Sequence, residues 1–221
     1  MSALPDGFRP HFLPPAVLTR IQEATWVTRH KGHLCIKSPF DFALYMQLLD
    51  RLRPATIFEI GANQGGSALW FADMMQVYGQ PGHVVSLDLP EVIAAMPFSD
   101  PRISFLAGDA CNLAATLTPA LLATLPRPWL VVEDSGHIFA TSTGVLEFFD
   151  PLMASGEYIV VEDASLSYFV KPMYRVFEDG PLRAIAAFLA RRGADYEVDR
   201  SLNDFYGPNV TWHCEGWLRR K

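Results

Sequence analysis

The stretch that decides the fold is Thr56-Ile57-Phe58-Glu59-Ile60-Gly61-Ala62-Asn63-Gln64-Gly65-Gly66-Ser67-Ala68-Leu69-Trp70. Its first residues are β-branched, aromatic and apolar, which is typical of a buried parallel strand. Glycines then break the strand, and Gly65-Gly66-Ser67 suits the start of a helix with a serine near the cap. A strand, a glycine turn and a helix in this order predict an open α/β sheet, with a nucleotide-like ligand at the carboxyl ends of its strands.

The spacing of the glycines limits which ligand can bind. The pattern Gly61-x-x-x-Gly65-Gly66 matches neither the dinucleotide motif G-x-G-x-x-G nor the phosphate loop G-x-x-x-x-G-K-[ST]. Glu59 precedes the first glycine by two residues, where it would repel a pyrophosphate but suit a cation. S-adenosylmethionine carries an ammonium and a sulfonium group and no phosphate, so the stretch favours it over NAD. The alternative at this point is an ordinary strand-to-helix turn with a solvated glutamate.

Length and composition indicate one globular domain. The chain has 221 residues, of which 50% are hydrophobic and 19% charged, and this balance excludes the disordered and fibrous classes. A net charge of −6 argues against nucleic-acid binding. The widely spaced Cys35, Cys111 and Cys214 predict neither a disulfide framework nor a zinc site. Because the N-terminus does not resemble a signal peptide and no apolar run approaches ~18 residues, we expect a cytoplasmic protein that does not contact membranes.

Beyond residue 54, apolar runs and helical patterns alternate as a parallel sheet with crossover helices requires. We expect strands at 56–60, 83–88, 103–106, 129–134 and 156–163, closing strands at 196–199 and 210–217, and helices at 113–125, 145–152 and 181–192. The predicted fold is therefore a doubly wound, mostly parallel seven-stranded sheet with helices on both faces.

The first part of the chain, residues 1–53, is expected to form an arm and a helical cap on the main domain of residues 54–221. Four prolines keep residues 1–15 extended. Helical spacing predicts helices at 16–29 and from Pro39 to Arg53. This pair of helices would cap the sheet edge or form a contact in a homo-oligomer.

Acidic residues close four of the predicted strands: Asp88, Asp109, Asp134, and Glu162 with Asp163. Parallel strands end at one crevice, so these side chains should converge. Asp88, after the second strand, can accept both ribose hydroxyls of an adenosine, which NAD and S-adenosylmethionine share. Asp109 lies where it could meet the adenine amino group, although a lone acid at a strand end is also commonly structural.

Three of these acids predict a metal site. Asp134, Glu162 and Asp163 would repel one another unless a cation neutralised them, and Mg²⁺ prefers such oxygen ligands. The alternative is a solvated turn, or the pairing of one acid with Lys171 or Arg175.

His137 lies three residues after Asp134, in the loop that follows the fourth strand. A neutral imidazole beside the proposed metal could take a proton from a hydroxyl, since its unperturbed pKa of about 6.5 suits a general base.

These motifs together resemble the cephalosporin hydroxylase family, which has an S-adenosylmethionine methyltransferase fold despite its name, and related sugar O-methyltransferases. The resemblance covers most of the chain. It is carried by Lys37-Ser38-Pro39-Phe40-Asp41, Phe58-Glu59-Ile60-Gly61, Gly65-Gly66-Ser67-Ala68, Asp134-Ser135-Gly136-His137, Gly156-Glu157-Tyr158-Ile159-Val160-Val161-Glu162-Asp163, Gly180-Pro181-Leu182, Phe188-Leu189 and Gly216-Trp217-Leu218-Arg219-Arg220.

The resemblance implies that the cofactors are S-adenosylmethionine and Mg²⁺. It implies that Asp134, Glu162 and Asp163 bind the metal, and that His137 is the general base beside Asp134. The loop 164–178 falls where such enzymes cover the substrate, although its aromatic residues would also suit the core. The residues expected to hold the methyl donor are Glu59, Gly61, Ala62, Gly65, Ser67, Asp88 and Asp109.

The sequence therefore predicts a Mg²⁺-dependent O-methyltransferase acting on a hydroxyl of a small molecule, such as a natural product or a sugar. Two alternatives stay open. One is an NAD-dependent oxidoreductase on a similar sheet, and the other is a catalytically silent ligand-binding protein with the same fold.

Overall fold

A seven-stranded sheet forms the centre of the molecule. The computed structural model describes residues 9–169 and 171–221, so most of the predicted arm at 1–15 lies outside the described residues. The strands are β3 (Thr56–Ile60), β4 (His83–Asp88), β5 (Ile103–Ala107), β6 (Trp129–Glu133), β7 (Tyr158–Val161), β8 (Tyr196–Val198) and β9 (Trp217–Arg220). Their order is β5-β4-β3-β6-β7-β9-β8. The first five are parallel and β9 runs antiparallel to both neighbours, which confirms the predicted sheet.

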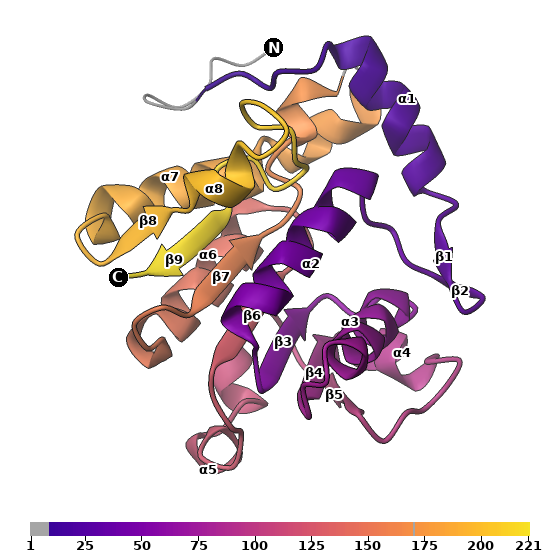
Figure 1. The fold of residues 1–221 in the computed structure, drawn as a ribbon, viewed down its shortest axis with the longest axis vertical. Helices are drawn as coiled ribbons and strands as arrows, with labels where there is room; N and C mark the ends of the chain where they lie inside the picture. The colour runs from indigo at the N-terminus through magenta and orange to yellow at the C-terminus, as the bar shows by residue number, and fades with distance from the viewer. Residues whose placement is uncertain (1–8, 170) are drawn as a thin grey trace.

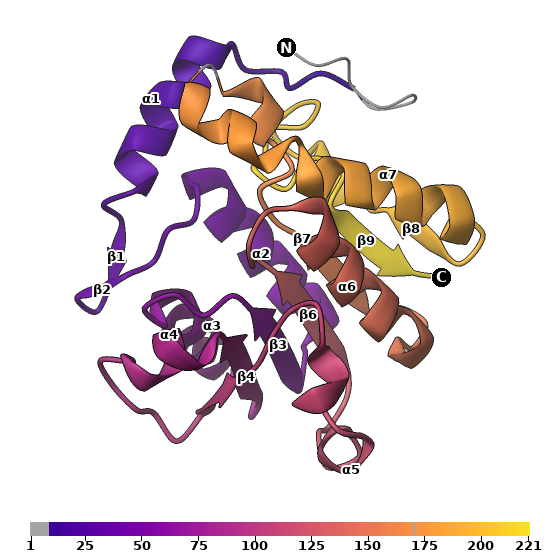
Figure 2. The same cartoon turned by 180° about the vertical axis from the view of Figure 1, so that it is seen from behind.

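Helices cover both faces of the sheet, as predicted. The near face in Figure 1 carries α2 (Pro39–Leu52), which packs in one core with α3 (Gly66–Val77). Figure 2 shows α6 (Phe139–Phe149) and α7 (Gly180–Arg192) over the opposite face, where they share a second core. The prediction that the second N-terminal helix caps the sheet edge is therefore wrong, because α2 buries Leu44, Leu48 and Leu49 on the sheet face.

Shorter elements complete the fold: α1 (Pro15–Thr25), β1 (Arg29–His30), β2 (His33–Leu34), α4 (Pro90–Ala94), α5 (Pro119–Leu122) and α8 (Arg200–Asn203). The helix predicted at 16–29 ends at Thr25, because the chain turns into the β1–β2 hairpin, whose turn contains Lys31 and Gly32 at positive φ. No described helix is both long and apolar enough to span a bilayer.

Two predicted elements are wrong. The helix expected at 113–125 is a 3₁₀ turn at Leu113–Ala115 followed by the separate helix α5, because Pro119 disfavours helical backbone at Thr118, which instead caps α5. The strand expected at 210–217 begins only at Trp217. The segment before it is held by side chains instead, since Asp41 accepts hydrogen bonds from Thr211 Oγ1 and Trp212 N.

The sheet order reverses between β3 and β6. The chain moves outward from β3 to β4 and β5, then returns to β6 on the other side of β3. The loops after these two strands therefore diverge to opposite faces and leave a crevice between them, which is the usual ligand position in such sheets. Gly61 follows β3 and Asp134 follows β6, so the two predicted parts of the site lie at this crevice.

Candidate active site

A cavity of about 590 Å³ lies at the crevice between β3 and β6. This volume is typical of small-molecule sites. Most of the residues predicted from the sequence line it: Gly61, Ala62, Ser67, Asp88, Asp109, Asp134, His137 and Asp163. Glu59, Gly65 and Glu162 are not among its lining residues.

The glycines of the turn serve close packing within the protein. Gly61 has φ +111°, and a Cβ there would lie 2.0 Å from the carbonyl oxygen of Asp134. A Cβ on Gly65, at φ +75°, would lie 2.9 Å from Met96 Sδ and from the Phe105 ring. Gly65 is the N-cap of α3. Gly61 therefore lets the end of β3 approach the end of β6 closely. Gly65 lets the turn pack against Met96 and Phe105, and it does not line the cavity.

Asp88 and Asp109 lie in the cavity wall and are held by backbone amides. Asp88 Oδ2 accepts a hydrogen bond from Asn63 N at 2.9 Å, and Oδ1 accepts one from Leu89 N at 2.7 Å. Asp109 Oδ1 accepts a hydrogen bond from Cys111 N at 2.8 Å. Carboxylate oxygens have further lone pairs, so both acids keep acceptor capacity toward the cavity.

Glu59 lies behind the cavity wall rather than in it. Side chains alternate along β3, so Ile60 lines the cavity while Glu59 points to the face covered by α2 and α3. Its Oε2 accepts a hydrogen bond from Ser86 at 2.5 Å, and its buried Oε1 has no hydrogen-bond partner among the described residues. Burial raises the pKa of Glu59 to about 7, although Lys37, Ser67 and Ser86 oppose the shift. Direct contact between Glu59 and a cofactor stays a prediction.

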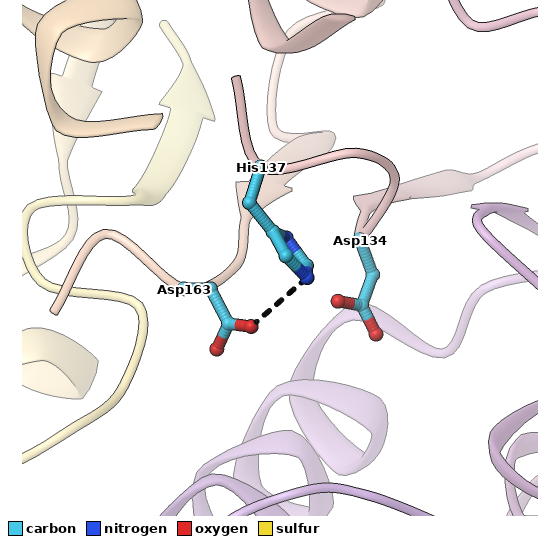
Figure 3. Close-up of side chains that lie close together, drawn as sticks. All are labelled: Asp134, His137 and Asp163. Carbon is cyan, nitrogen blue, oxygen red and sulfur yellow. Dashed lines mark ion pairs between the residues drawn. The ribbon is translucent and has the colours of Figure 1, made fainter. Parts of the chain in front are cut away.

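Asp134, His137 and Asp163 form one cluster. A ligand atom of each lies within 4.8 Å of those of the other two, which is the arrangement expected of groups that could share a metal ion. Figure 3 shows the His137 ring reaching between the two carboxylates, with its Nε2 lying 3.4 Å from Asp163 Oδ2. His137 and Asp163 both have positive φ, at +54° and +55°.

The charges of the cluster are coupled. Burial raises the pKa of Asp134 to about 6, with Glu162 adding to the shift and Lys37 opposing it. Burial also raises the pKa of Asp163, against the influence of His137. For His137 itself, burial lowers the pKa, but Asp163, Asp134 and more distant carboxylates outweigh it, so the net shift is upward. These carboxylates therefore stabilise a protonated imidazole.

Glu162 points away from this cluster. Its Oε2 accepts a hydrogen bond from Lys37 Nζ at 2.7 Å, and its Oε1 accepts one from Tyr45 Oη at 2.6 Å. Lys37 Nζ also lies 2.9 Å from Asp134 Oδ2. Lys171, which was considered as a partner for these acids, instead pairs with Glu23 at 3.0 Å. Metal binding by Glu162 stays a prediction, and it would require this carboxylate to turn from its present partners.

Lys37 is the functional candidate that sequence reasoning missed. It lines the cavity, and the residue is only 3% exposed. A lysine is almost never buried without partners, but nothing in the local sequence indicates that Lys37 would be buried. The resemblance included Lys37 only as part of a motif, and its partners lie 97 and 125 residues further along the chain.

The loop expected at 164–178 contributes side chains to both the cavity and the core. Tyr174 and Phe177 line the cavity, and the Phe177 ring meets His137 edge-on at 5.5 Å between centroids. Tyr168 and Phe169 belong to the core, where Phe169 packs against Trp212. That the loop covers the substrate stays a prediction. Two further cavity residues, Trp26 and Met173, are 45% and 55% exposed and were not predicted.

Comparison with known proteins identifies relatives of this chain. The family model "Rhamnosyl O-methyltransferase/CmcI" matches residues 22–221. A rhamnosyl O-methyltransferase of Mycobacterium leprae is 32% identical over 198 residues, covering 89% of this chain and 83% of that protein. One from Mycobacterium tuberculosis H37Rv is 29% identical over 182 residues, covering 81% and 74% of the two chains.

Solved structures show the same fold. A structure of CmcI with Mg and SAM has a TM-score of 0.69 at 22% identity, covering 99% of this chain and 88% of that one. An O-methyltransferase from Bacillus cereus in complex with SAH has a TM-score of 0.51 at 16% identity, covering 81% and 78%. None of these relatives is an NAD-dependent oxidoreductase. The chain belongs to the rhamnosyl O-methyltransferase/CmcI family of S-adenosylmethionine-dependent O-methyltransferases.

Proposed function

We propose that this enzyme methylates a hydroxyl of a small molecule, such as a sugar or a natural product, with a divalent cation at the ends of β6 and β7 and His137 as the general base. The observation that carries the proposal is the cluster of Asp134, His137 and Asp163, whose ligand atoms lie within 4.8 Å of one another. The cluster borders the same cavity as the glycine turn. A methyl donor on the turn would therefore lie beside the groups that prepare the acceptor.

The residues present fit both cofactors. On the donor side, Asp88 and Asp109 offer carboxylate oxygens, and apolar residues such as Leu89 and Val92 line the same wall. On the metal side, the Asp134 and Asp163 carboxylates supply oxygen atoms and no thiolate belongs to the cluster, which suits a hard cation such as Mg²⁺ or Mn²⁺. We propose Asp134 and Asp163 as ligands, with Glu162 as the third.

When bound, S-adenosylmethionine supplies an electrophilic methyl group, and the cation acidifies and orients the acceptor hydroxyl. The chain itself must remove the proton. His137 Nε2 faces the cluster, and we assign it as the atom that accepts the proton. Asp163 Oδ2, 3.4 Å away, then stabilises the imidazolium and holds the ring in position.

The acceptor would lie against the part of the cavity wall formed by Trp26, Met173, Tyr174 and Phe177. Aromatic rings pack well on the apolar faces of sugars and other rings. The curated relatives that we compared are rhamnosyl O-methyltransferases, so rhamnosides are the first acceptors to test.

The experiment is a methyl-transfer assay with S-adenosylmethionine, a panel of rhamnosides and polyhydroxylated natural products, and added Mg²⁺, Mn²⁺ or EDTA. We expect a methyl ether and S-adenosylhomocysteine to form together, and EDTA to stop both. Turnover that is unaffected by EDTA would contradict the metal. Tight binding of S-adenosylmethionine in calorimetry without turnover of any acceptor would favour a ligand-binding protein instead.

A further inference from the structure

Lys37 is an unusual cation for the interior of a protein. Its side chain is 1% exposed, and Lys37 is the only lysine or arginine among the buried residues of the chain as described, 9–169 and 171–221. Burying an ammonium is costly unless it is paired and hydrogen-bonded. Its two partners are carboxylates, Asp134 at 2.9 Å and Glu162 at 2.7 Å.

These partners lie at the ends of neighbouring parallel strands. Asp134 follows β6 and Glu162 follows β7, and Glu162 N donates to Glu133 O between the two strands. Lys37 therefore joins the two strand ends from the side of the N-terminal segment. Without a cation here, two close carboxylates would repel each other and turn apart.

The backbone that presents Lys37 is itself well anchored. Cys35 N donates to Thr28 O, and Lys37 N donates to Cys35 O, both at 3.0 Å. On the other side, Ser38 caps α2 by accepting from Asp41 N. The lysine is thus held on both sides, which suits a group that must keep other groups in place.

One partner of Lys37 belongs to the cluster described above. Asp134 Oδ2 faces Lys37, while a ligand atom of Asp134 lies within 4.8 Å of those of His137 and Asp163. Since no other described residue donates a hydrogen bond to the Asp134 side chain, Lys37 decides how this carboxylate is oriented toward its neighbours. Groups that orient metal ligands in this way strongly influence metal affinity.

We propose that Lys37 is a positioning residue for divalent-cation binding, holding the Asp134 and Glu162 carboxylates in the arrangement that the cation requires. The inference rests on the metal site of the proposed function. The positioning role can be distinguished from a purely electrostatic one, because an ammonium near a metal cation also repels that cation. If Lys37 acted only through its charge, its removal would strengthen cation binding; if it positions the carboxylates, removal weakens binding.

The test is Mn²⁺ binding, followed by the electron paramagnetic resonance signal of the free ion. The variants are Lys37→Met, which keeps the aliphatic stem, and Lys37→Gln, which keeps a hydrogen-bond donor and serves if the methionine variant does not fold. We expect both to bind Mn²⁺ about tenfold more weakly or worse. Lys171→Met is the matched control, since Lys171 pairs with Glu23 at the surface, and it should bind as the parent does.

Parental or tighter Mn²⁺ binding by a folded Lys37 variant would overturn the inference and leave the metal site intact. Failure of both variants to fold, judged by circular dichroism, would make the ammonium a requirement of the whole fold and would overturn a role specific to the site. A parent protein that binds no Mn²⁺ would instead remove the metal from the proposed function, and this inference with it.

Discussion

The two sides of the cavity are held together by different kinds of interaction. On the glycine-turn side, Asp88 and Asp109 accept hydrogen bonds from backbone amides, two of them one and two residues away in the sequence. On the carboxylate side, Asp134 and Glu162 are held by Lys37, across 97 and 125 residues. The first side is built by local backbone geometry, and the second by buried charges brought together from distant segments.

This difference has a chemical counterpart. On the proposed donor side, backbone amides fix the Asp88 and Asp109 carboxylates in place, which suits a methyl donor whose structure does not vary. In the proposed function the carboxylate side handles a proton and a cation, so it needs groups whose charge can respond. If the two sides act separately, a substitution on one side should impair either methyl-donor binding or the handling of the proton and the cation, and leave the other unchanged.

The largest expected effect comes from His137→Ala. If His137 is the general base, its loss should slow turnover by roughly 10²- to 10⁴-fold, while S-adenosylmethionine binding, measured by calorimetry, stays nearly parental. His83→Ala is a suitable control, because His83 begins β4 and bonds to Ser104 away from the cavity. Equal rates for His137→Ala and the parent at saturating Mg²⁺ would contradict the assignment of His137 as the base. A parallel loss of Mn²⁺ binding would show instead that His137 is a metal ligand.

Gly61→Ala should disrupt the point where the two sides touch. The new Cβ would lie 2.0 Å from the Asp134 carbonyl oxygen, on backbone with φ +111°. Overpacking and backbone strain together should lower the free energy of unfolding by about 4 kcal/mol, measured in urea. Gly156→Ala is the matched control, because Gly156 has φ +88° but nothing within 4 Å of its added Cβ, so it should cost only about 1–2 kcal/mol. Similar losses of unfolding free energy in both variants would show that the Asp134 carbonyl oxygen does not exclude a side chain at position 61.

The same difference explains what the sequence predicts well. The strands, their parallel order and the glycine turn follow from local patterns, because a buried strand and a glycine turn carry their signals within a few residues. The position of Asp88 and Asp134 at strand ends follows in turn from the sheet. The helix expected at 113–125 is wrong because Pro119 begins a new helix there, with Thr118 as its cap.

The carboxylate side shows which features cannot be predicted from the sequence. Counting acids at strand ends identifies Asp134, Glu162 and Asp163 but not which way each side chain turns. That choice depends on Lys37 and Tyr45, which come from a segment far away in the sequence. Glu59 is a different case, because strand alternation, a local feature, places it behind the wall, where burial raises its pKa to about 7.

Glu59→Gln should change the pH dependence of stability. The pKa of Glu59 is about 7 in the folded protein against about 4.5 unfolded, so the folded state binds its proton more tightly. The stability that this proton provides is present below pH 4.5 and is lost as the pH rises through 7. The loss should reach about 3 kcal/mol in the parent, and Glu59→Gln should not show it.

Urea unfolding between pH 5 and 8, in buffer with EDTA, measures this difference. Asp100→Asn is the control: its pairing with Arg102 lowers the pKa of Asp100 to about 2, so it should leave the slope between pH 5 and 8 unchanged. Parallel stability curves for Glu59→Gln and the parent would mean that Glu59 does not titrate in this range, and that a neighbour keeps it ionised.

The smallest effect is expected from Tyr45→Phe, which separates positioning from charge. Tyr45 Oη donates to Glu162 Oε1 at 2.6 Å, and the ring packs against Phe71 and Trp217, so the variant loses one hydrogen bond and keeps its packing. Unfolding should become easier by about 1–2 kcal/mol.

Because no charge changes, any weakening of Mn²⁺ binding in Tyr45→Phe reports only the freed Glu162 carboxylate. We expect binding about threefold weaker, less than the roughly tenfold loss usual when a group that orients a metal ligand is removed. Tyr158→Phe removes a comparable bond, from Tyr158 Oη to Asp199 at 2.7 Å, away from the cavity, and it should bind Mn²⁺ as the parent does. If Tyr45→Phe also binds as the parent does, then the orientation of Glu162 does not limit cation binding. Asp134 and Asp163 would then be sufficient for cation binding. Of the two carboxylates that Lys37 holds, only Asp134 would affect that binding.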